Sequence, residues 1–402
     1  MYFARKRLTV IDLFAGVGGL SYGFAHDRRF ELVAANEVLH PMAKAYALNH
    51  PMVKMYEGDI ADFGAAAIGK DLGIRRSDID VIIGGPPCQA YSTIGKRLLD
   101  DPRGMLFREY VRVLKEFKPR LFIFENVKGL LSMAGGELIG AVVSLFESIG
   151  YTVTCKVLNA ADFGVPQRRE RVIIVGTADG KEFAYPSPTH YDPTRNAAHD
   201  TAQKPYLTLS DAIGDLPLIR SGESSYDYAC EPHNDYQRAM RANAPKKLMD
   251  HIASKSSSRL VRLMESLPDG GRPHDLPEIP DWFTSLRSFP NTYSRLWWRK
   301  PSTTITRNFS AASGSRCIHP LTPRPLTTRE GARLQSFPDD FRFYGSRSDK
   351  NLQIGNAVPP FLSAALAEAV ARHLLGGDER CELPGRGERH GTRREQSPTT
   401  AV

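Results

Sequence analysis

The chain has 402 residues, of which 41% are hydrophobic and 24% charged, and this composition is ordinary for a globular protein with two or three domains. The first apolar run is interrupted by Asp12 and by glycines, too early for a signal peptide or a membrane span, so we expect a cytoplasmic protein without a membrane partner. The five cysteines form no Cys-x-x-Cys pair, which argues against a zinc ribbon and a disulfide framework. We expect no metal site.

The formal net charge of +8 suggests a polyanionic partner, and the positions of the basic residues are more informative than their number. Between Trp282 and Arg329 the sequence has no Asp or Glu but holds all three tryptophans. This stretch is either a solvated basic face or a surface that faces phosphates. Its basic residues are Arg287, Arg295, Arg299, Lys300, Arg307, Arg316, Arg324 and Arg329.

From its start to residue 178, short β-branched runs alternate with helical patterns, which predicts an α/β domain with a doubly wound, mostly parallel, Rossmann-like sheet. Residues 179–322 are rich in Pro, Ser, Asn and Tyr, which indicates a second, smaller and irregular domain. A helical periodicity appears again in residues 323–376, and we expect this segment to pack against the first domain. Residues 377–402 are too polar to fold alone. Strands are expected at 8–13, 31–36, 80–83, 120–124, 151–158 and 171–176, and helices at 106–117, 136–149 and 359–375.

The first predicted strand runs into a glycine-rich turn that opens a helix, in the stretch "VIDLFAGVGGL". Gly16, Gly18 and Gly19 let a ligand approach the backbone at a helix N-terminus, or serve the turn alone. Their Gly-x-Gly-Gly spacing differs from the dinucleotide fingerprint, which disfavours a nicotinamide cofactor. Glu37 ends the next strand, where a carboxylate can accept from both ribose hydroxyls, and Asp59 follows a third strand. Together these features favour an adenosyl cofactor.

A second group of residues follows other strands of the same sheet. Cys88, in "GGPPCQAYS", comes after two glycines and two prolines that hold it at the carboxyl end of a strand. It is either a nucleophile or a small buried apolar residue. Glu125, in "LFIFENV", is a catalytic carboxyl group or a helix cap. Arg169 and Arg171, in "QRRERV", share one face of a strand, where they grip a carbonyl oxygen or form a surface ion-pair ladder.

Six motifs in register resemble the DNA (cytosine-5)-methyltransferase family of bacterial restriction-modification systems. They are "DLFAGVGGL", "GGPPCQAYS", "ENV", "QRRERV", "RPLTTREGARLQSFPDDF" and "IGNAVPP". The resemblance implies S-adenosylmethionine as the cofactor. Its binding positions fall on Phe14, Gly16, Gly18, Gly19, Glu37, Asp59, Leu106 and Asn356. Val38 stands where several members of the family carry an aromatic residue that stacks on adenine.

The resemblance also implies a reaction and a substrate. The methyl group goes to C5 of a cytosine flipped out of a specific double-stranded DNA sequence, through a covalent bond between Cys88 and C6. Glu125, Arg169 and Arg171 assist, and the middle domain recognises the target. The implied DNA contacts are Gln89, Ser92, Arg299, Thr306 and Arg307. We expect a monomer with a cognate restriction endonuclease as its functional partner.

Three alternatives stay open at this point. They are an RNA methyltransferase of the same architecture, a catalytically dead DNA-binding regulator and a nicotinamide-dependent dehydrogenase. The large middle domain favours duplex DNA, and the presence of Cys88, Glu125 and Arg171 argues against a dead enzyme. The recognition sequence itself is not predicted.

Overall fold

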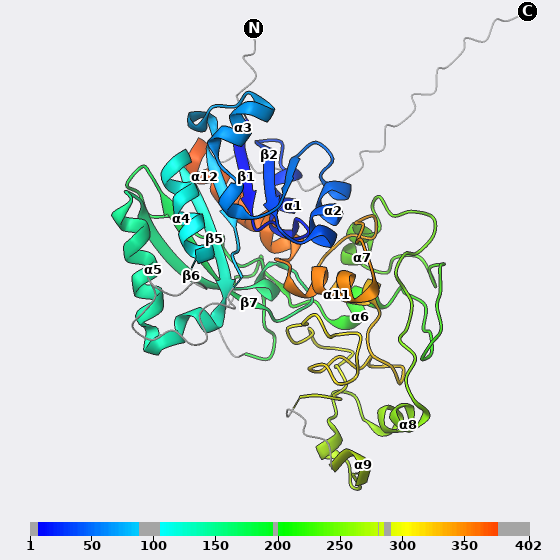
Figure 1. The fold of residues 1–402 in the computed structure, drawn as a ribbon. Coiled ribbons are helices and arrows are strands. Elements are labelled where there is room, and N and C mark those ends of the chain that lie inside the picture. Colours follow the sequence, from blue (N-terminus) through cyan, green and yellow to red (C-terminus); the bar gives the residue numbers. More distant parts are fainter. Residues whose placement is uncertain (1–6, 88–104, 196–199, 280, 285–290, 377–402) are drawn as a thin grey trace, which may run out of the picture.

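A seven-stranded sheet forms the larger lobe in the computed structural model, which describes residues 7–87, 105–195, 200–279, 281–284 and 291–376 (Figure 1). The strand order is β3-β2-β1-β4-β5-β7-β6, and β7 alone runs antiparallel to its neighbours. The predicted α/β class and mostly parallel sheet are therefore confirmed. The strands are β1 (Leu8–Leu13), β2 (Phe30–Glu37), β3 (Lys54–Glu57), β4 (Val81–Gly84), β5 (Leu121–Val127), β6 (Thr152–Asn159) and β7 (Glu170–Thr177).

The smaller lobe is mostly loop, as its composition predicted (Figure 1). It contains a two-residue ladder of β8 (His190–Tyr191) and β9 (Lys204–Pro205), and the short helices α6 (Leu209–Ile213), α7 (Asp235–Met240), α8 (Ser258–Ser266) and α9 (Asp281–Thr284). Helices α10 (Thr328–Leu334) and α11 (Arg347–Asn356) join the lobes. Single 3₁₀ turns lie at Ile60–Asp62, Arg76–Asp78, Lys128–Leu131, Met133–Gly136, Ala160–Phe163 and Pro273–Asp275.

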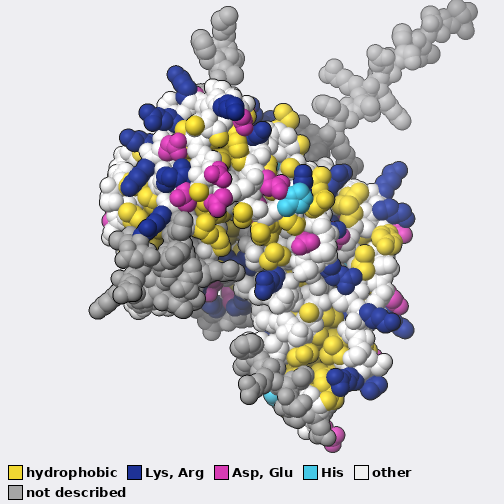
Figure 2. Space-filling view, in the orientation of Figure 1, with side chains coloured by type: hydrophobic (Ala, Val, Ile, Leu, Met, Phe, Trp, Pro, Cys, Tyr) yellow, Lys and Arg dark blue, Asp and Glu magenta, His cyan; other side chains and the backbone are white. Residues whose placement is uncertain are grey.

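Neither interpretation of the acid-free stretch, a solvated basic face or a surface that faces phosphates, holds for half of its basic residues. Arg295, Arg316, Arg324 and Arg329 are buried, because backbone carbonyl groups and carboxylates of the protein surround their guanidinium groups. On the face in Figure 2, the smaller lobe shows separate Lys and Arg side chains at its outline and no continuous basic patch among the described residues. Arg299, Lys300 and Arg307 are exposed, and Arg287 lies outside the described residues.

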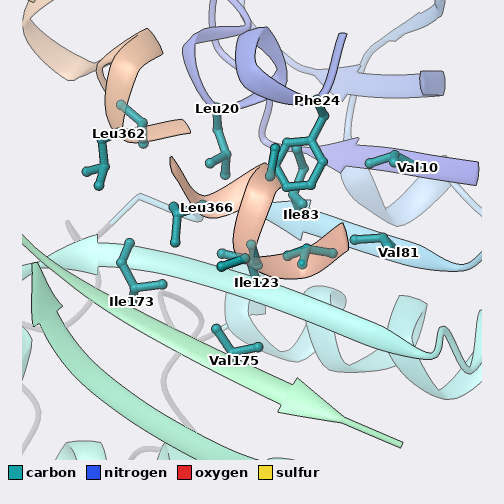
Figure 3. Close-up of a cluster of buried hydrophobic side chains, with 14 of the residues drawn as sticks. Val10, Leu20, Phe24, Val81, Ile83, Ile123, Ile173, Val175, Leu362 and Leu366 are labelled. Atoms are coloured by element: carbon teal, nitrogen blue, oxygen red, sulfur yellow. The ribbon is translucent and has the colours of Figure 1, made fainter. Parts of the chain in front are cut away.

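Helices cover both faces of the sheet and form two apolar cores. Helices α1 (Gly19–Ala25) and α12 (Pro360–Leu375) pack on one face, where Leu362 and Leu366 meet Ile83, Ile123 and Ile173 of the strands (Figure 3). The other face is covered by α3 (Ala65–Leu72), α4 (Met105–Phe117) and α5 (Glu137–Ser148). Helix α2 (His40–Asn49) lies beside β3 and α11. The chain therefore passes through the whole of the other lobe, after β7 ends at Thr177, before α12 begins at Pro360 and completes the first core.

One helical stretch, Arg347–Leu375, is long and apolar enough to cross a membrane by length and composition. However, 67% of its most apolar window is buried inside the protein. It comprises α11 and α12, which are separated by two prolines, and the apolar side of α12 covers the sheet. The packing of α12 in the core of the sheet therefore explains why the stretch Arg347–Leu375 is apolar.

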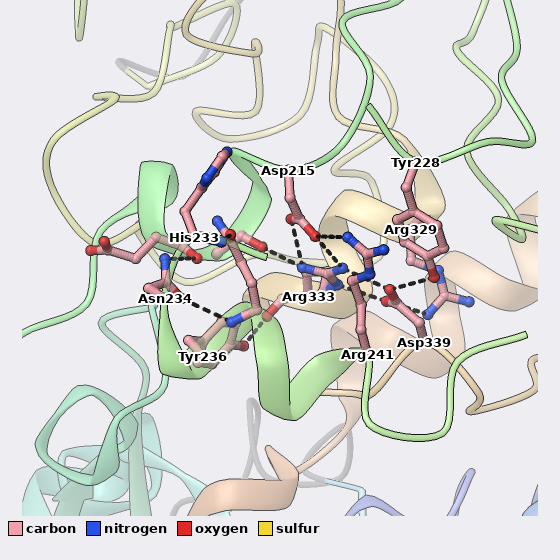
Figure 4. Close-up of polar contacts among 12 residues, drawn as sticks. Asp215, Tyr228, His233, Asn234, Tyr236, Arg241, Arg329, Arg333 and Asp339 are labelled. Carbon is pink, nitrogen blue, oxygen red and sulfur yellow. Dashed lines mark hydrogen bonds and ion pairs between the residues drawn. The ribbon is translucent and has the colours of Figure 1, made fainter. Parts of the chain in front are cut away.

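A buried ionic cluster fastens the smaller lobe to α10 (Figure 4). The guanidinium group of Arg333 bonds to the carboxylates of Asp339, at 2.6 Å, and Asp215, at 3.1 Å. Tyr228 donates to Asp339 at 2.8 Å, and Arg241 contacts Asp215 at 3.4 Å. Arg333 holds the pKa of the Asp339 carboxyl below its usual range, against the opposing effect of burial. Because removing one partner of a buried pair leaves an uncompensated charge, this cluster fixes how the two lobes meet.

The contact between α1 and α12 gives a stability prediction. Gly23 donates its N–H to the Ser363 hydroxyl at 2.9 Å, and a Cβ on Gly23 would overlap the Ser363 backbone. We expect Gly23→Ala to lower the free energy of unfolding by about 1–3 kcal/mol, since overpacking forces the helices apart. Gly140 is exposed near the N-terminus of α5 with no atom within 4 Å of an added Cβ, so Gly140→Ala should instead stabilise by up to about 1 kcal/mol. Urea unfolding measures both, and equal effects would contradict the packing argument.

Candidate functional site

Both groups of predicted site residues lie at one edge of the sheet. Strands β1 to β5 are parallel, so their carboxyl ends meet at this edge, and the strand order reverses between β1 and β4. Open α/β sheets bind ligands at this reversal point. The glycine turn follows β1, and the segment that leads to Cys88 follows β4. The two groups are therefore neighbours.

The glycine turn has a backbone that favours glycine at two positions. Gly16 and Gly18 have φ values of 55° and 88°, and Phe14, which is not glycine, has 54°. Only Gly16 has open space where a Cβ would point; at Gly18 that space is filled by His50, and at Gly19 by the carbonyl group of Val358. A ligand can therefore approach the backbone closely at Gly16, whereas Gly18 and Gly19 lack side chains because protein atoms pack against them.

Glu37 is oriented by the turn that precedes it. Its carboxylate accepts from the N–H of Gly16 at 2.8 Å and from that of Leu39 at 2.9 Å. Burial raises the pKa of the Glu37 carboxyl, and these backbone donors oppose the rise. A carboxylate has about four acceptor positions, and the backbone N–H groups of Gly16, Leu39 and Val38 do not use all of them.

The remaining predicted cofactor positions surround this turn. Asp59 is exposed and accepts from the N–H of Ala61 at 2.9 Å, which leaves its second oxygen open. The adjoining Gly58 donates its N–H to the Glu37 carbonyl group at 3.0 Å, so the two acids lie at neighbouring strand ends. Asn356 is exposed at the end of α11, and Val38 has 62% of its surface exposed. Leu106 is half-buried on α4.

Asp12 is a buried carboxyl group near the glycine turn that sequence reasoning did not single out. It accepts from the Ser21 hydroxyl at 2.6 Å, and Ser21 also bonds to Tyr46 at 2.8 Å. Burial raises the pKa of Asp12 to about 8, and Glu37 adds to the rise. At neutral pH the side chain is therefore mostly protonated.

Glu125 and Arg171 form the centre of the group of residues that the sequence predicts to be catalytic. In the β5–β7 ladder Glu125 is opposite Ile173, so Arg171 is its diagonal neighbour on the same face. The Arg171 Nε lies 2.9 Å from the Glu125 carboxylate. Burial raises the pKa of Glu125, whereas Arg171 and Arg169 oppose the rise. Burial and the neighbouring positive charges therefore act in opposite directions on the pKa of Glu125, and burial has the larger effect.

The Gly-Gly-Pro-Pro segment is fitted to Glu125. A Cβ on Gly85 would lie 2.7 Å from the Glu125 carboxylate, so only glycine leaves room for it. The Asn126 side chain donates to the Pro86 carbonyl group at 3.2 Å and ties β5 to this segment. Sequence reasoning gave no role to Gly85 or Asn126 individually. Cys88 follows directly, outside the described residues together with Gln89 and Ser92.

Arg171 is the second residue of β7, whereas Arg169 precedes the strand, and the two arginines have different surroundings. Arg169 is fully buried and donates to the carbonyl groups of Ile305, at 3.2 Å, and Gly355, at 2.9 Å. Gln167 supports the same junction, because its side-chain oxygen accepts from the Ile305 N–H at 3.0 Å. Arg169 therefore holds a loop of the smaller lobe and the end of α11 against β7.

The predicted DNA contacts in the described part of the chain lie at this junction. Thr306 and Arg307 are exposed directly after Ile305, whose backbone Arg169 and Gln167 bind. Arg299 is also exposed. At most about 7 Å of chain separates Ile305 from Arg307, so the loop brings the smaller lobe to the catalytic edge.

Comparisons with known proteins agree with this geometry. The family model of C-5 cytosine-specific DNA methylases matches residues 8–372. The chain belongs to this family. It is 35% identical to the type II methyltransferase M.AgeI of Thalassovita gelatinovora, over 90% of this chain and 99% of that one. It is 37% identical to M1.HphI of Haemophilus parahaemolyticus, over 91% and 87%.

Solved structures show the same fold. A DNA modification methyltransferase encoded within an E. coli prophage superposes with a TM-score of 0.72 at 25% identity, covering 92% of this chain and all of that one. The Dnmt2 methyltransferase of S. pombe shares the fold, with a TM-score of 0.59 at 17% identity, 92% coverage of this chain and 100% of its own. The chain is thus a DNA (cytosine-5-)-methyltransferase with type II relatives.

The fit between Gly85 and Glu125 gives a prediction for catalysis. An alanine at residue 85 pushes the Glu125 carboxylate away from Arg171, and we expect Gly85→Ala to lower kcat for methyl transfer by about 10- to 100-fold. Gly129→Ala is the matched control, since the nearest atom would be 3.9 Å from its Cβ. Incorporation of labelled methyl groups into DNA measures both variants. An unchanged kcat in Gly85→Ala would show that Glu125 does not need this position.

Asp12 gives a prediction for the pH dependence of stability. Between its ordinary pKa near 4 and its folded pKa of about 8, the folded state holds a proton that the unfolded state has lost. The contribution of this group to stability therefore falls as pH rises through this window, by up to about 1.4 kcal/mol per pH unit. We expect Asp12→Asn to gain stability relative to the wild type from pH about 5 to about 8, measured by urea unfolding. A difference that stays constant over this range would contradict the raised pKa.

Proposed function

We propose that the protein transfers a methyl group from S-adenosylmethionine to C5 of a cytosine flipped out of a specific double-stranded DNA sequence. The observation that carries this proposal is the pairing of Glu125 with Arg171 at the same sheet edge as the open turn at Gly16. A base that reaches Glu125 would lie next to a ligand held at Gly16. Methyl transfer needs this arrangement, because both reactants must be bound side by side.

The residues around Gly16 fit an adenosyl cofactor. The spare acceptor positions of Glu37 suit two ribose hydroxyls, and the open oxygen of Asp59 suits the adenine amino group. The exposed Val38 side chain offers an apolar surface to the adenine ring in place of an aromatic one. When bound, S-adenosylmethionine supplies an electrophilic methyl group carried on a sulfonium.

C5 of cytosine is a poor nucleophile until another group adds to the ring. We assign that addition to Cys88, whose thiolate forms a bond to C6 and places electron density on C5. After methylation, loss of the proton at C5 expels the thiolate and restores the aromatic ring. The segment before Cys88 is fixed on β4 and β5, which supports a nucleophile held at the cleft edge.

Glu125 and Arg171 would prepare the ring for this addition. The raised pKa of Glu125 favours a carboxyl group that donates a proton or hydrogen bond to N3. Arg171 would polarise O2 while it orients Glu125. We assign Arg169 a positioning role, because its guanidinium group binds backbone carbonyl groups of the protein.

The smaller lobe would read the DNA. We propose that residues 179–322 form the target-recognition domain, that 1–178 with 323–376 form the catalytic domain, and that Gln89, Ser92, Arg299, Thr306 and Arg307 contact DNA. The cytosine must leave the duplex, since neither face of its ring is reachable within the base stack. We further propose a cytoplasmic monomer, and the type II names of the relatives favour a cognate restriction endonuclease.

The covalent step can be tested with 5-fluorocytosine at the target position. Bisulfite sequencing of DNA from a methylation-free host that expresses the protein first gives the target sequence. Fluorine cannot leave as a cation, so the enzyme should transfer one methyl group and stay bound to the DNA through Cys88. We expect a complex that survives denaturing electrophoresis and requires both S-adenosylmethionine and the target sequence.

Cysteine variants provide the controls for this experiment. Cys88→Ser should abolish the complex, since a hydroxyl is a far weaker nucleophile at neutral pH. Serine variants of Cys155, Cys230, Cys317 and Cys381 should form it as the wild type does. A bond that maps to another residue, or no complex on a proven substrate, would overturn the role of Cys88.

A further inference from the structure

A basic pocket of about 520 Å³ lies between α8 and α11, next to the loop that contains Ile305, Thr306 and Arg307, which we call the recognition loop. Among the described residues that line it, Lys255, Arg307 and Arg347 are basic and none is acidic. Six serines and two asparagines add hydroxyl and amide groups to the wall, and Leu260 and Tyr293 add apolar surface. The volume is in the range of ligand sites, larger than a single phosphate needs.

The three basic side chains lack carboxylate partners in the part of the chain that the structure describes. Arg347 donates to the Ser254 hydroxyl at 2.9 Å, and Lys255 and Arg307 are exposed at the pocket. By contrast Lys350, one turn further along α11, is neutralised by Asp250 at 2.6 Å. The positive charges that line the pocket are therefore not neutralised by carboxylates, whereas the neighbouring charge of Lys350 is.

The walls of the pocket are held in place before any ligand arrives. Ser254 donates to the Ser310 carbonyl group at 2.9 Å, which joins the segment before α8 to the segment after the recognition loop. Asn351 of α11 donates to the Ser310 hydroxyl at 2.5 Å, and Thr328 of α10 donates to Asn351 at 2.9 Å. Because the wall is already ordered, less conformational entropy is lost when a ligand binds.

The position of the pocket indicates which ligand reaches it. Arg307 lines the pocket, and two residues before it Ile305 is bound by Arg169 at the catalytic edge. A DNA strand whose cytosine reaches Glu125 would therefore have neighbouring phosphates near this pocket. Ser257, the N-cap of the nine-residue helix α8, lines the pocket and makes no side-chain capping bond.

We propose that this pocket binds a sugar–phosphate segment of the DNA backbone, with Lys255, Arg307 and Arg347 on the phosphates and Tyr293 and Leu260 against the sugar. This inference rests on the proposed DNA substrate and adds a backbone site to it. Phosphate contacts of this kind set affinity and register, and carry no base information directly.

The test uses the double variant Lys255→Gln/Arg347→Gln and a labelled duplex that contains the target sequence. The readout is fluorescence polarisation at several salt concentrations. Each lost phosphate contact reduces the slope of log Kd against log salt by about one unit. We expect the slope to fall by about two units and Kd to rise about 10- to 100-fold at low salt.

A matched control removes the same net charge elsewhere. Lys246 and Arg342 are exposed and do not line the pocket, so Lys246→Gln/Arg342→Gln should leave the slope within about half a unit of the wild type. Equal losses in both double variants would overturn the proposal in favour of a net-charge effect. Melting temperatures by circular dichroism confirm that all variants are folded.

Two further measurements separate the remaining outcomes. If inorganic phosphate raises the melting temperature of the wild type but not of the pocket variant, while the DNA slope is unchanged, the pocket takes a free anion and the DNA proposal is wrong. Methylation by the wild type is measured in parallel. A wild type that methylates DNA, together with an unaltered slope in the pocket variant, would overturn the pocket while the proposed function stands.

Discussion

The Arg169 guanidinium group joins three distant parts of the chain, and the geometry of the site depends on it. It extends from the start of β7, beside Arg171 and Glu125, and donates to the carbonyl groups of Ile305 and Gly355. A buried arginine with carbonyl partners is costly to displace, because each freed carbonyl group would lose its hydrogen bond in a place without water. The smaller lobe is thereby fixed to the residues expected to perform the chemistry.

Close approach of backbones is the second constraint on this junction. Gly355 has no Cβ because the backbone of Thr306 and Arg307 occupies that space, and Gly19 is pressed against Val358 in the same way. The segment that leads from α11 into α12 therefore contacts both the recognition loop and the glycine turn. A change in the position of one lobe would therefore displace residues of the predicted cofactor site as well as residues of the predicted catalytic site.

Charge in and beside the smaller lobe has two separate uses. Buried arginines at the junction of the lobes, such as Arg324 with Glu330 and Arg333 with Asp215, are neutralised and hold the smaller lobe in place. The exposed Arg307 has no carboxylate partner among the described residues and is available to a polyanion. Composition alone cannot separate these uses, because a stretch without acids looks equally basic whether its partners are distant carboxylates or DNA phosphates.

The sequence by itself determined the α/β class and most of the strands, since strand and helix periodicities are local, and it determined which residues follow those strands; the bounds of β3, the strand order and the antiparallel direction of β7 came from the tertiary structure. Because parallel strands end at one edge, the positions of Glu37, Asp59 and Glu125 on that edge followed directly. Only the tertiary structure decided that Gly85 makes room for Glu125 and that Arg169 binds carbonyl groups of the protein. These are contacts between segments far apart in the chain, and no local pattern encodes their distances. The burial of Arg295, Arg316, Arg324 and Arg329 belongs to the same class, because it depends on how an irregular lobe packs.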